Sequence, residues 1–197
     1  MFNGIIFNQG TLKKIIKRPK GLNIFLKTDL KLKKKDLGIS VACDGVCLTL
    51  ISVKKGILEF YLSNETINRS NFRNIKVGST LNLELPLKYK QSISGHICQG
   101  HVDTVGKILL ISKIDKSYLF KFQIDKKFRK ELIEKASISI NGISLTISKL
   151  TQNGFEIWVI PHTFKLTNLS KLSKGSIVNI EIDILSKYVR NYLNVKK

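Results

Sequence analysis

The sequence has few acidic residues, few cysteines and no long apolar run. It contains 14 Asp and Glu against 34 Lys and Arg, which gives a formal net charge of +20 in 197 residues. Its three cysteines lack Cys-x-x-Cys spacing, so we expect reduced thiols. No apolar run approaches the roughly 20 residues that cross a bilayer. The first residues also lack the basic and apolar regions of a cleaved signal. These absences favour a cytoplasmic protein without membrane contact.

Motifs for common cofactors and metals are missing as well. There is no phosphate-binding glycine loop, no nucleophile elbow and no zinc-protease motif. The three histidines, His96, His101 and His162, are not spaced like a set of metal ligands. We therefore expect neither a metal nor a cofactor.

The positive charge has two interpretations. A basic protein of this kind is typical of nucleic-acid binding. However, only five of the 34 basic residues are arginine, the residue best suited to base and phosphate contacts. The aromatic residues are not interleaved with arginine as a stacking surface requires. Compositional drift toward lysine on a solvated surface is therefore favoured, and a basic nucleic-acid-binding barrel is the less favoured alternative.

The chain repeats itself at an offset of 97 residues. Segment 40–50 aligns with segment 137–147, and the register continues without a gap as far as residues 84 and 181. Identical pairs at this offset include Ser40 and Ser137, Gly45 and Gly142, Thr49 and Thr146, and Glu84 and Glu181. Such a register indicates two copies of one domain, which we place at residues 1–90 and 91–186.

Each copy has the pattern of a small antiparallel barrel. Short segments alternate apolar and polar residues, and the first two are joined by the turn signal Asp44-Gly45, or Asn141-Gly142 in the second copy. The predicted strands cover residues 39–43, 46–50, 58–62 and 80–85 in the first copy, and 155–159 and 177–182 in the second. Several short strands with regular turns favour a closed barrel. Residues 126–135 have helical spacing and predict a short helix beside the second barrel.

The end of the chain has no counterpart in the first copy. From residue 184 onward, apolar residues recur at helical spacing, and Asp183 or Ser186 would cap the start. The apolar stripe consists of Leu185, Tyr188, Val189, Tyr192 and Leu193. The stripe either packs on its own barrel or pairs with copies of itself in an oligomer.

The copies differ where side chains could carry chemistry. Cys47 aligns with Ser144, and Leu-Thr follows each of them. If alternate apolar residues fill the barrel, Cys47 and Ser144 face outward with the threonines. Packing and functional roles remain open for Cys47. Cys43 aligns with the apolar Ile140 and is predicted to be a core thiol.

Motifs along nearly the whole chain resemble those of the riboflavin synthase family. They are Met1-Phe2-Asn3-Gly4-Ile5-Ile6, Ser40-x4-Gly45-Val46-Cys47-Leu48-Thr49, Asn64-Glu65-Thr66, Gly95-His96, Gly100-His101-Val102-Asp103, Asn141-Gly142-Ile143-Ser144-Leu145-Thr146, Ile160-Pro161-His162-Thr163 and Asn179-Ile180-Glu181-Ile182-Asp183. Asn3, where the family usually has Thr, and Ser94, where Gly is frequent, depart from the pattern without touching the main chemical positions.

The resemblance implies an all-β fold of two similar six-stranded antiparallel Greek-key barrels in tandem with a C-terminal α-helix. It implies a transferase that dismutates two molecules of 6,7-dimethyl-8-ribityllumazine to riboflavin and 5-amino-6-ribitylaminouracil, the last step of riboflavin biosynthesis, without a cofactor. Residues 187–197 would form a trimerisation helix. The N-terminal barrel of one subunit would meet the C-terminal barrel of a neighbour in a homotrimer, and association with lumazine synthase is a further expected partnership.

The resemblance also implies site residues. The first lumazine would contact Gly4, Ile5, Ile6, Cys47, Leu48, Thr49 and the strand of Tyr61, Leu62, Ser63, Asn64, Glu65 and Thr66. The second would contact Gly100, His101, Val102, Lys135, Ser144, Leu145, Thr146 and the strand of Trp158, Val159, Ile160, Pro161, His162 and Thr163. Catalytic roles fall to Ser144 and Thr146 in methyl deprotonation, His101 in proton transfer, Cys47 and Ser40 at the acceptor, and Asp183 in orientation.

A non-catalytic lumazine- or flavin-binding protein is the nearest alternative. Such a protein would keep the double barrel but would need only one good site. Both copies here keep the Leu-Thr pair beside Cys47 or Ser144, and this favours the enzyme.

Overall fold

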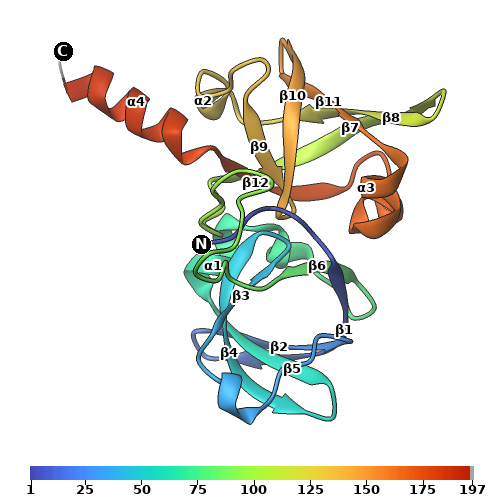
Figure 1. Cartoon of the computed structure of the whole chain (residues 1–197), viewed down its shortest axis with the longest axis vertical. Coiled ribbons are helices and arrows are strands. Elements are labelled where there is room, and N and C mark those ends of the chain that lie inside the picture. The colour runs from blue at the N-terminus through green and yellow to red at the C-terminus, as the bar shows by residue number, and fades with distance from the viewer. Residues whose placement is uncertain (196–197) are drawn as a thin grey trace.

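The chain forms two closed antiparallel barrels in succession and a C-terminal helix that extends away from them (Figure 1). The computed structural model describes residues 1–195. In Figure 1 the N-terminal barrel lies below the C-terminal barrel, and the N-terminus lies near the level where they meet. The predicted fold of two six-stranded barrels in tandem with a C-terminal helix is confirmed.

The two barrels follow the same path. The N-terminal barrel consists of β1 (Asn8–Arg18), β2 (Gly21–Thr28), β3 (Ser40–Cys43), β4 (Val46–Lys54), β5 (Ile57–Ser63) and β6 (Thr80–Glu84). The C-terminal barrel consists of β7 (Thr104–Ile114), β8 (Ser117–Gln123), β9 (Ser137–Ile140), β10 (Ile143–Thr151), β11 (Gly154–Val159) and β12 (Ile177–Ile182). The strands close in the orders β1-β2-β5-β4-β3-β6 and β7-β8-β11-β10-β9-β12. Each predicted strand is present.

Short helices lie in the connections between strands, at matching places in the two barrels. They are α1 (Asn64–Arg69), α2 (Lys126–Arg129) and α3 (Pro161–Leu166), with 3-10 turns η1 (Lys34–Asp36), η2 (Asn71–Asn74) and η3 (Asn168–Lys171). The α1-η2 and α3-η3 pairs each connect the fifth strand of a barrel to its sixth. The repeat therefore extends from the strands to the connections.

Bulges lie at equivalent positions in the two barrels. The pairing of β1 with β2 shifts register between Leu12 and Lys14, and the pairing of β7 with β8 shifts between Ile108 and Leu110. A second matching pair of shifts lies between β4 and β5 and between β10 and β11. A bulge bends its strand and increases the twist, which helps a six-stranded sheet to close on itself.

Each barrel has its own apolar core. Phe60 is fully buried in the N-terminal core, and Phe120 is fully buried in the C-terminal core. The alternation on β4 sends Val46 and Leu48 inward, as expected. Cys43 is fully buried in the N-terminal core, so its prediction as a core thiol is confirmed.

The barrels meet at the two predicted hairpin turns. Asp44 and Gly45 have φ angles of +46° and +76°, and Asn141 and Gly142 have +46° and +79°. Positive φ at both central residues is the geometry that favours Asn-Gly and Asp-Gly. A Cβ atom on Gly45 would lie 2.7 Å from the backbone nitrogen of Gly142, so the turns face each other too closely for a side chain.

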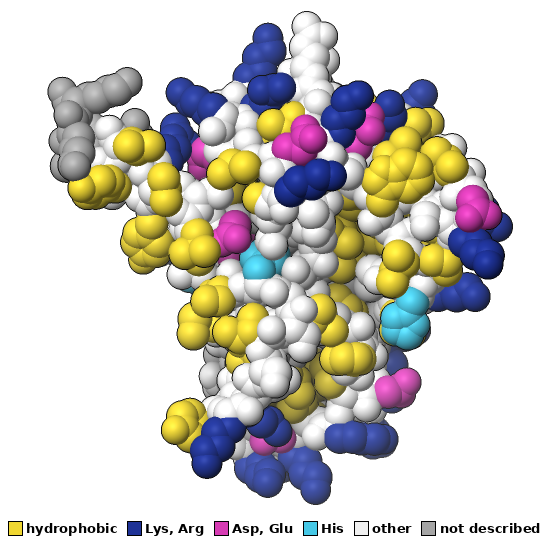
Figure 2. Space-filling model, turned by 45° about the horizontal axis from the view of Figure 1, so that its top comes forward, with side chains coloured by type: hydrophobic (Ala, Val, Ile, Leu, Met, Phe, Trp, Pro, Cys, Tyr) yellow, Lys and Arg dark blue, Asp and Glu magenta, His cyan; other side chains and the backbone are white. Residues whose placement is uncertain are grey.

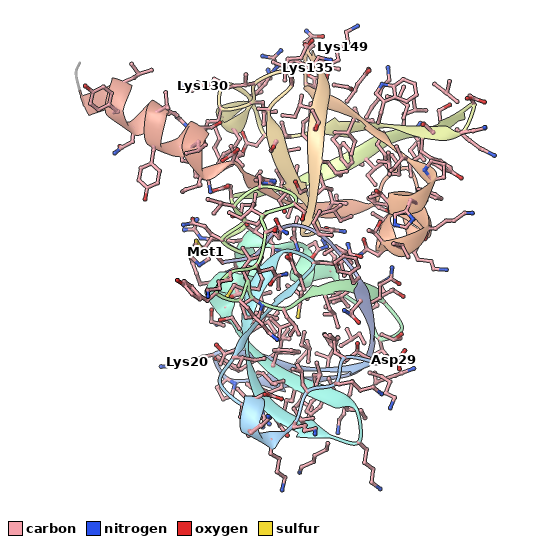
Figure 3. The ribbon with its side chains drawn as sticks, viewed as in Figure 1. Met1, Lys20, Asp29, Lys130, Lys135 and Lys149 are labelled. Atoms are coloured by element: carbon pink, nitrogen blue, oxygen red, sulfur yellow. The ribbon has the colours of Figure 1, made fainter. Side chains whose placement is uncertain are left out.

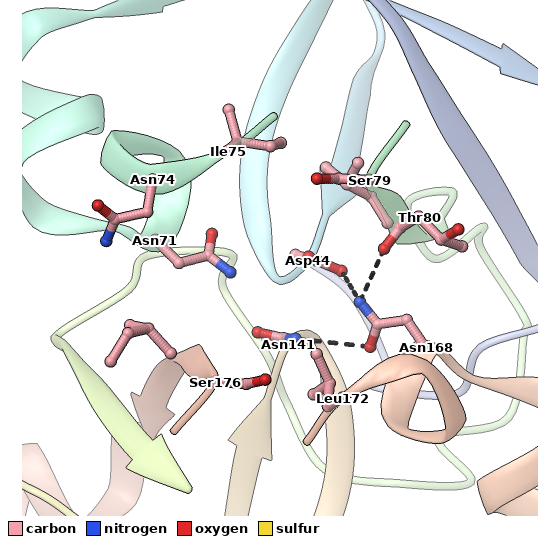
Figure 4. Close-up of a pocket in the computed structure, with 12 residues that line it drawn as sticks. Asp44, Asn71, Asn74, Ile75, Ser79, Thr80, Asn141, Asn168, Leu172 and Ser176 are labelled. Atoms are coloured by element: carbon pink, nitrogen blue, oxygen red, sulfur yellow. Dashed lines mark hydrogen bonds between the residues drawn. The ribbon is translucent and has the colours of Figure 1, made fainter. Parts of the chain in front are cut away.

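Buried side-chain amides join these turns across the interface, and Figure 4 shows one of them, Asn168, bonded to Asp44. The Asn82 amide donates to the carbonyl of Asn141 at 3.0 Å, and the equivalent Asn179 donates to the carbonyl of Asp44 at 2.8 Å. The Asn168 amide donates to the Asp44 carboxylate at 2.9 Å. Burial raises the pKa of Asp44 to about 7. Each of these bonds runs from one barrel to the other, so the cluster fixes their relative placement.

Two predicted strands end earlier than expected. The resemblance treated residues 61–66 and 158–163 as single strands, but β5 ends at Ser63 and β11 ends at Val159. The Ser63 hydroxyl accepts a hydrogen bond from the Thr66 amide at 3.2 Å, which caps α1. Proline at the first position of α3 provides a preformed helical φ angle. The second half of each segment is therefore helical.

The predicted helix over residues 126–135 is also shorter, because α2 ends at Arg129. The next amides, of Glu131 and Leu132, donate to carbonyls three residues earlier. Lys135 then has a φ angle of +70°. Bonds of this spacing form tight 3-10 turns, and a left-handed residue ends them before β9.

The C-terminal helix α4 (Ile184–Val195) begins where the predicted helical spacing begins, before the domain boundary set at residue 187. The Asp183 carboxylate accepts a hydrogen bond from the Leu185 amide at 3.0 Å, so Asp183 is the capping residue. Ion pairs tie the base of the helix to its own chain: Lys187 to Asp103 at 2.6 Å, and Arg190 to Glu131. Its apolar side chains remain 59–67% exposed at Leu185, Tyr188, Val189 and Leu193.

Basic and apolar side chains are unevenly distributed on the face that Figure 2 shows. On the face in Figure 2, most Lys and Arg lie toward the two ends of the molecule, few lie over its middle, and apolar side chains gather along α4. Within residues 1–195, no helix is long and apolar enough to cross a membrane.

Candidate functional site

A cavity of about 340 Å³ opens on the N-terminal barrel. The start of β4 forms one wall, α1 forms another, and the segment that precedes β7 closes it. Its lining consists of Val46, Cys47, Glu65, Thr66, Arg69, Ser70, Gly100, His101, Val102 and Asp103. We call it the N-terminal cavity.

A smaller cavity of about 90 Å³ opens on the C-terminal barrel. The start of β10, the helix α3 and the segment that precedes β1 form its walls. Its lining consists of Gly4, Ile5, Ile6, Phe7, Ile143, Ser144, His162, Thr163, Leu166 and Thr167. We call it the C-terminal cavity.

In both cavities, one wall comes from the other copy of the repeat. The segment before β1 crosses to the C-terminal barrel, where the Gly4 carbonyl accepts a hydrogen bond from the Ser144 amide at 2.7 Å. The segment before β7 crosses to the N-terminal barrel, where the Gly100 carbonyl accepts from the Cys47 amide at 2.8 Å. The two barrels therefore exchange their leading segments.

This exchange corrects the expected grouping of site residues. The resemblance placed residues 4–6 with the N-terminal site and residues 100–102 with the C-terminal site, and the structure places each with the other. Ile6 is buried in the C-terminal core, and Val102 packs on the N-terminal core. Burial of these apolar side chains stabilises the crossed arrangement.

Glycine is required where each crossing segment touches the other barrel. Gly4 and Gly100 have φ angles of +74° and +79°. An added Cβ atom would lie 2.6 Å from the Cβ of Ser144 at Gly4, and 2.6 Å from the Cβ of Cys47 at Gly100. No side chain fits at these contacts, so the two positions hold the backbone directly against the cavity residues.

The two linings are equivalent position by position. The offset is 97 residues for the barrel positions and 96 for the crossing segments. Chemistry differs at five pairs: Cys47 and Ser144, Glu65 and His162, Arg69 and Leu166, His101 and Ile5, and Asp103 and Phe7. The N-terminal cavity thus carries a thiol, an imidazole, a guanidinium and two carboxylates. At the same five positions, the C-terminal cavity carries a hydroxyl, an imidazole and three apolar side chains.

Ser144 has a histidine partner that was not predicted as a site residue. The His96 Nδ1 atom lies 2.7 Å from Ser144 Oγ, and the His96 Nε2 atom lies 3.5 Å from Cys98 Sγ. Burial lowers the pKa of His96, an effect that the Asp183 carboxylate opposes. The imidazole is therefore neutral near pH 7, and one ring nitrogen can accept a proton from the serine.

Burial also keeps the neighbouring thiol neutral. Burial, together with the nearby Glu181 carboxylate, raises the pKa of Cys98 to about 12. Cys98 is 3% exposed and packs with Phe2 in a small apolar cluster. The thiol therefore serves as packing beside His96 rather than as a thiolate.

Several predicted site residues lie outside both cavities. The apolar cores hold Leu48, Leu62, Leu145 and Val159 wholly or in part. Exposed or half-exposed positions hold Ser40, Thr49, Tyr61, Thr146, Trp158 and Ile160. The starts of the helices hold Ser63, Asn64, Pro161 and the cap Asp183. Lys135 lies at the outer end of the C-terminal barrel (Figure 3). Contact of these residues with a ligand stays a prediction.

Other lining residues were not predicted. They are Val46, Arg69, Ser70 and Asp103 in the N-terminal cavity, and Phe7, Ile143, Leu166 and Thr167 in the C-terminal cavity. The repeat register already pairs these positions, so comparison of the copies would have found each pair once one member was known. His96 lies before the first strand of the second barrel, and at the offset of 96 residues its counterpart would fall before residue 1. The repeat therefore gave no signal for it.

Comparison with known proteins assigns the class. The lumazine binding domain matches twice, at residues 3–86 and 99–183. The structure also resembles LumP complexed with riboflavin, with a TM-score of 0.83 and 25% identity over 92% of this chain and 99% of that chain. LumP complexed with 6,7-dimethyl-8-(1'-D-ribityl) lumazine gives a TM-score of 0.80 over the same shares. The fold is thus that of a double lumazine-binding domain.

Full-length relatives narrow the class. Riboflavin synthase of Actinobacillus pleuropneumoniae is 35% identical over 193 residues, covering 98% of this chain and 90% of the relative. Riboflavin synthase of Bacillus subtilis (strain 168) is 33% identical over 194 residues, with the same shares. The chain belongs to the riboflavin synthase family.

Proposed function

We propose that the chain is a transferase that dismutates two molecules of 6,7-dimethyl-8-ribityllumazine. One molecule donates a four-carbon unit to the other, giving riboflavin and 5-amino-6-ribitylaminouracil. The pair of equivalent cavities with unlike side chains carries this proposal. Two identical substrates need two related sites, and two roles in one reaction need different chemical groups.

Orientation supplies much of the rate in this proposal. A reaction between two bound substrates becomes effectively unimolecular when the protein holds them face to face. The C7 methyl group of the lumazine is acidic, because its carbanion delocalises into the ring. General acid–base help of about 10²–10⁴-fold therefore suffices for the proton transfers.

The C-terminal cavity would hold the donor lumazine. In the tautomer with the proton on Nε2, the His96 Nδ1 atom accepts the hydroxyl hydrogen of Ser144 over 2.7 Å. The C7 methyl proton passes to Ser144 Oγ while the hydroxyl proton passes to His96, and the electron pair remains on the methyl carbon. Thr146, two residues along β10, is proposed to assist from the exposed face.

The N-terminal cavity would hold the acceptor. Cys47 and His101 line it, and Ser40 lies on the adjacent strand β3. His101 is proposed to transfer protons, and Cys47 and Ser40 are proposed to contact the acceptor ring. Asp183 acts electrostatically on His96, which fits its proposed role in orientation.

The two lumazines are proposed to meet between subunits of a homotrimer. The N-terminal cavity of one subunit would face the C-terminal cavity of a neighbour, and α4 would hold the subunits together. The exposed apolar stripe of α4 supports this arrangement, since Val189 and Leu193 are 60% and 59% exposed. Lys135 lies outside both cavities of its own chain, so it would serve a neighbour. Cytoplasmic location, association with lumazine synthase and the domain boundaries stay predictions.

Charge placed on the stripe tests the trimer. Val189→Asp combined with Leu193→Asp should give a monomer in sedimentation and abolish turnover, because the paired cavities separate. The control variant Asn191→Asp adds a charge at another exposed position of α4, and this variant should remain a trimer. A fully active monomer would contradict the shared site.

Ligand stoichiometry tests the function. Equilibrium titration should show two lumazines bound per chain, with riboflavin formed during the measurement. The likeness to LumP favours one second candidate, a protein that binds a lumazine or flavin without turnover. One ligand per chain and no riboflavin would support that candidate instead.

A further inference from the structure

Two buried carboxylates lie where the crossing segments begin. Glu84, the last residue of β6, is 9% exposed. One of its carboxylate oxygens accepts a hydrogen bond from the Asn3 amide at 2.7 Å, and the other accepts from the Gly4 amide at 3.0 Å. Both carboxylate oxygens thus accept hydrogen bonds from the backbone of the segment that precedes β1.

The second copy repeats this arrangement. Glu181 in β12 is 3% exposed. One of its oxygens accepts from the Gln99 amide at 2.6 Å, and the other accepts from the amides of Gly100 at 2.9 Å and His101 at 3.2 Å. The carboxylates therefore hold the two crossing segments at equivalent positions.

Each carboxylate belongs to one barrel and acts on the cavity of the other. Glu84 is part of the N-terminal barrel, but the carbonyl of the Gly4 that it holds bonds to Ser144 in the C-terminal cavity. Glu181 is part of the C-terminal barrel, but the carbonyl of the Gly100 that it holds bonds to Cys47 in the N-terminal cavity.

We propose that Glu84 and Glu181 are positioning residues with crossed effects: Glu84 fixes a wall of the C-terminal cavity, and Glu181 fixes a wall of the N-terminal cavity. Only the consequence for lumazine binding rests on the proposed function. The crossed placement itself rests on the hydrogen bonds and the exchange of segments.

The chemistry explains why a carboxylate is needed. A carboxylate accepts on both oxygens, and charge-assisted bonds to backbone amides are stronger than neutral ones. Burial raises the pKa of both groups, and the backbone amides that they accept from lower it again. Glutamine has nearly the same shape but turns one acceptor into a donor, which would face a backbone N–H.

Thiol labelling reports on each cavity wall separately. Cys47 is half-buried and is the native reporter of the N-terminal cavity, whereas Cys43 and Cys98 are buried. Ser144→Cys in a Cys47→Ser background moves the reporter to the C-terminal cavity. Glu181→Gln should raise the iodoacetamide labelling rate at the first reporter by about tenfold, the effect of losing one such bond, and leave the second unchanged. Glu84→Gln should do the reverse.

Control variants separate positioning from general loosening. Glu59→Gln and Glu156→Gln change another equivalent pair of strand carboxylates, which bond to the side chains of Asn23 and Lys121 rather than to a crossing segment, and should leave both rates unchanged. If a glutamine variant does not fold, Glu84→Asp and Glu181→Asp keep the charge, shorten the side chain and should give the same crossed pattern with smaller rises. An equal change in labelling rate at both reporters would overturn the proposal. So would a rise only at the reporter in the barrel that contains the substituted glutamate.

Lumazine titration provides the second readout. Each glutamine variant should bind one lumazine per chain with native affinity and lose the other site by about tenfold in affinity. If labelling is crossed but the wild-type protein binds no lumazine, the proposed function fails while the positioning roles stand. If lumazine binds at both sites in both variants and labelling is unchanged, the positioning roles fail.

Discussion

The two cavities share a backbone plan and differ in their side chains. Each is built from the start of the fourth strand of one barrel, the helix after its fifth strand, and a leading segment from the other copy. The N-terminal cavity is about 340 Å³ and rich in charged groups, and the C-terminal cavity is about 90 Å³ and largely apolar. Duplication thus supplies the geometry twice, and divergence at a few positions assigns a different task to each copy.

The comparison also shows how the copies depend on each other. Because the leading segments are exchanged, neither barrel completes a cavity alone. Hydrogen bonds from the Asn82 and Asn179 amides reinforce the contact between the barrels. An isolated β-bridge also pairs the backbones of Phe2 and Cys98, one from each leading segment. A substitution in one copy can therefore alter the cavity of the other copy.

Removing the serine of the C-terminal cavity should have the largest effect. Ser144→Ala should lower turnover by about 10²–10⁴-fold, because His96 then has no hydroxyl through which to receive the methyl proton. His96→Gln should lower it comparably, and the double variant should lose little more, since the two act as a unit. Steady-state rates measure this.

A nearby serine is the control. The Ser148 hydroxyl, on the same strand, donates to the carbonyl of Glu156, so Ser148→Ala should keep nearly full turnover. If Ser144→Ala turns over as fast as this control, the donor role of the C-terminal cavity is wrong.

Asp44, the acidic residue in the turns where the two barrels meet, should make the stability of the protein depend on pH. The pKa of Asp44 is raised from 3.8 to about 7 in the folded protein. Between these values the native state keeps the proton that the unfolded state releases, so stability should fall with rising pH by up to about 1.4 kcal/mol per pH unit.

Asp44→Asn matches Asn141 of the other copy and keeps the oxygen that accepts from Asn82. Denaturant unfolding at several pH values should show this fall in the wild type and a flatter curve in the variant. Parallel curves for the two proteins would contradict the protonation of buried Asp44.

Making the copies alike at one position should have a smaller effect on turnover. Cys47→Ser gives the N-terminal cavity the side chain that the C-terminal cavity already has, and we expect a loss of about tenfold, or about 1.4 kcal/mol in the barrier. His101→Gln should lose a similar factor or more. Unfolding midpoints control for stability, and full turnover in both variants would disprove these assignments.

Salt should have the smallest effect. On the face in Figure 2, most Lys and Arg lie toward the two ends of the molecule, and none of the described lysines lines either cavity. Turnover should therefore change by less than about twofold between 50 and 200 mM salt, whereas a protein with several phosphate contacts would lose about 10³–10⁵ in affinity over that range. Tight, salt-dependent binding of an oligonucleotide would revive the nucleic-acid alternative.

Much of the barrel was predictable because strand alternation and the repeat register are local or linear signals. The strands around Asp44-Gly45 follow the alternation closely. The strands β1, β2, β7 and β8 were not predicted. In the pairings of β1 with β2 and of β7 with β8, a bulge after Leu12 or Ile108 interrupts the period of two.

The composition of each cavity was less predictable. Alternation places Cys47 and Ser144 on an outer face but does not say which leading segment covers them. That choice depends on the three-dimensional crossing of the segments at Gly4 and Gly100. The His96–Ser144 contact was missed for a similar reason, because it joins the linker to the second barrel across 48 residues.

Incubation of the purified protein with 6,7-dimethyl-8-ribityllumazine alone tests the central claim most directly. Riboflavin should appear in its absorbance spectrum without any added cofactor, with one riboflavin and one 5-amino-6-ribitylaminouracil formed for every two lumazines consumed. Folded protein that binds the lumazine and forms no riboflavin would contradict the claim that the two cavities act together as one catalyst.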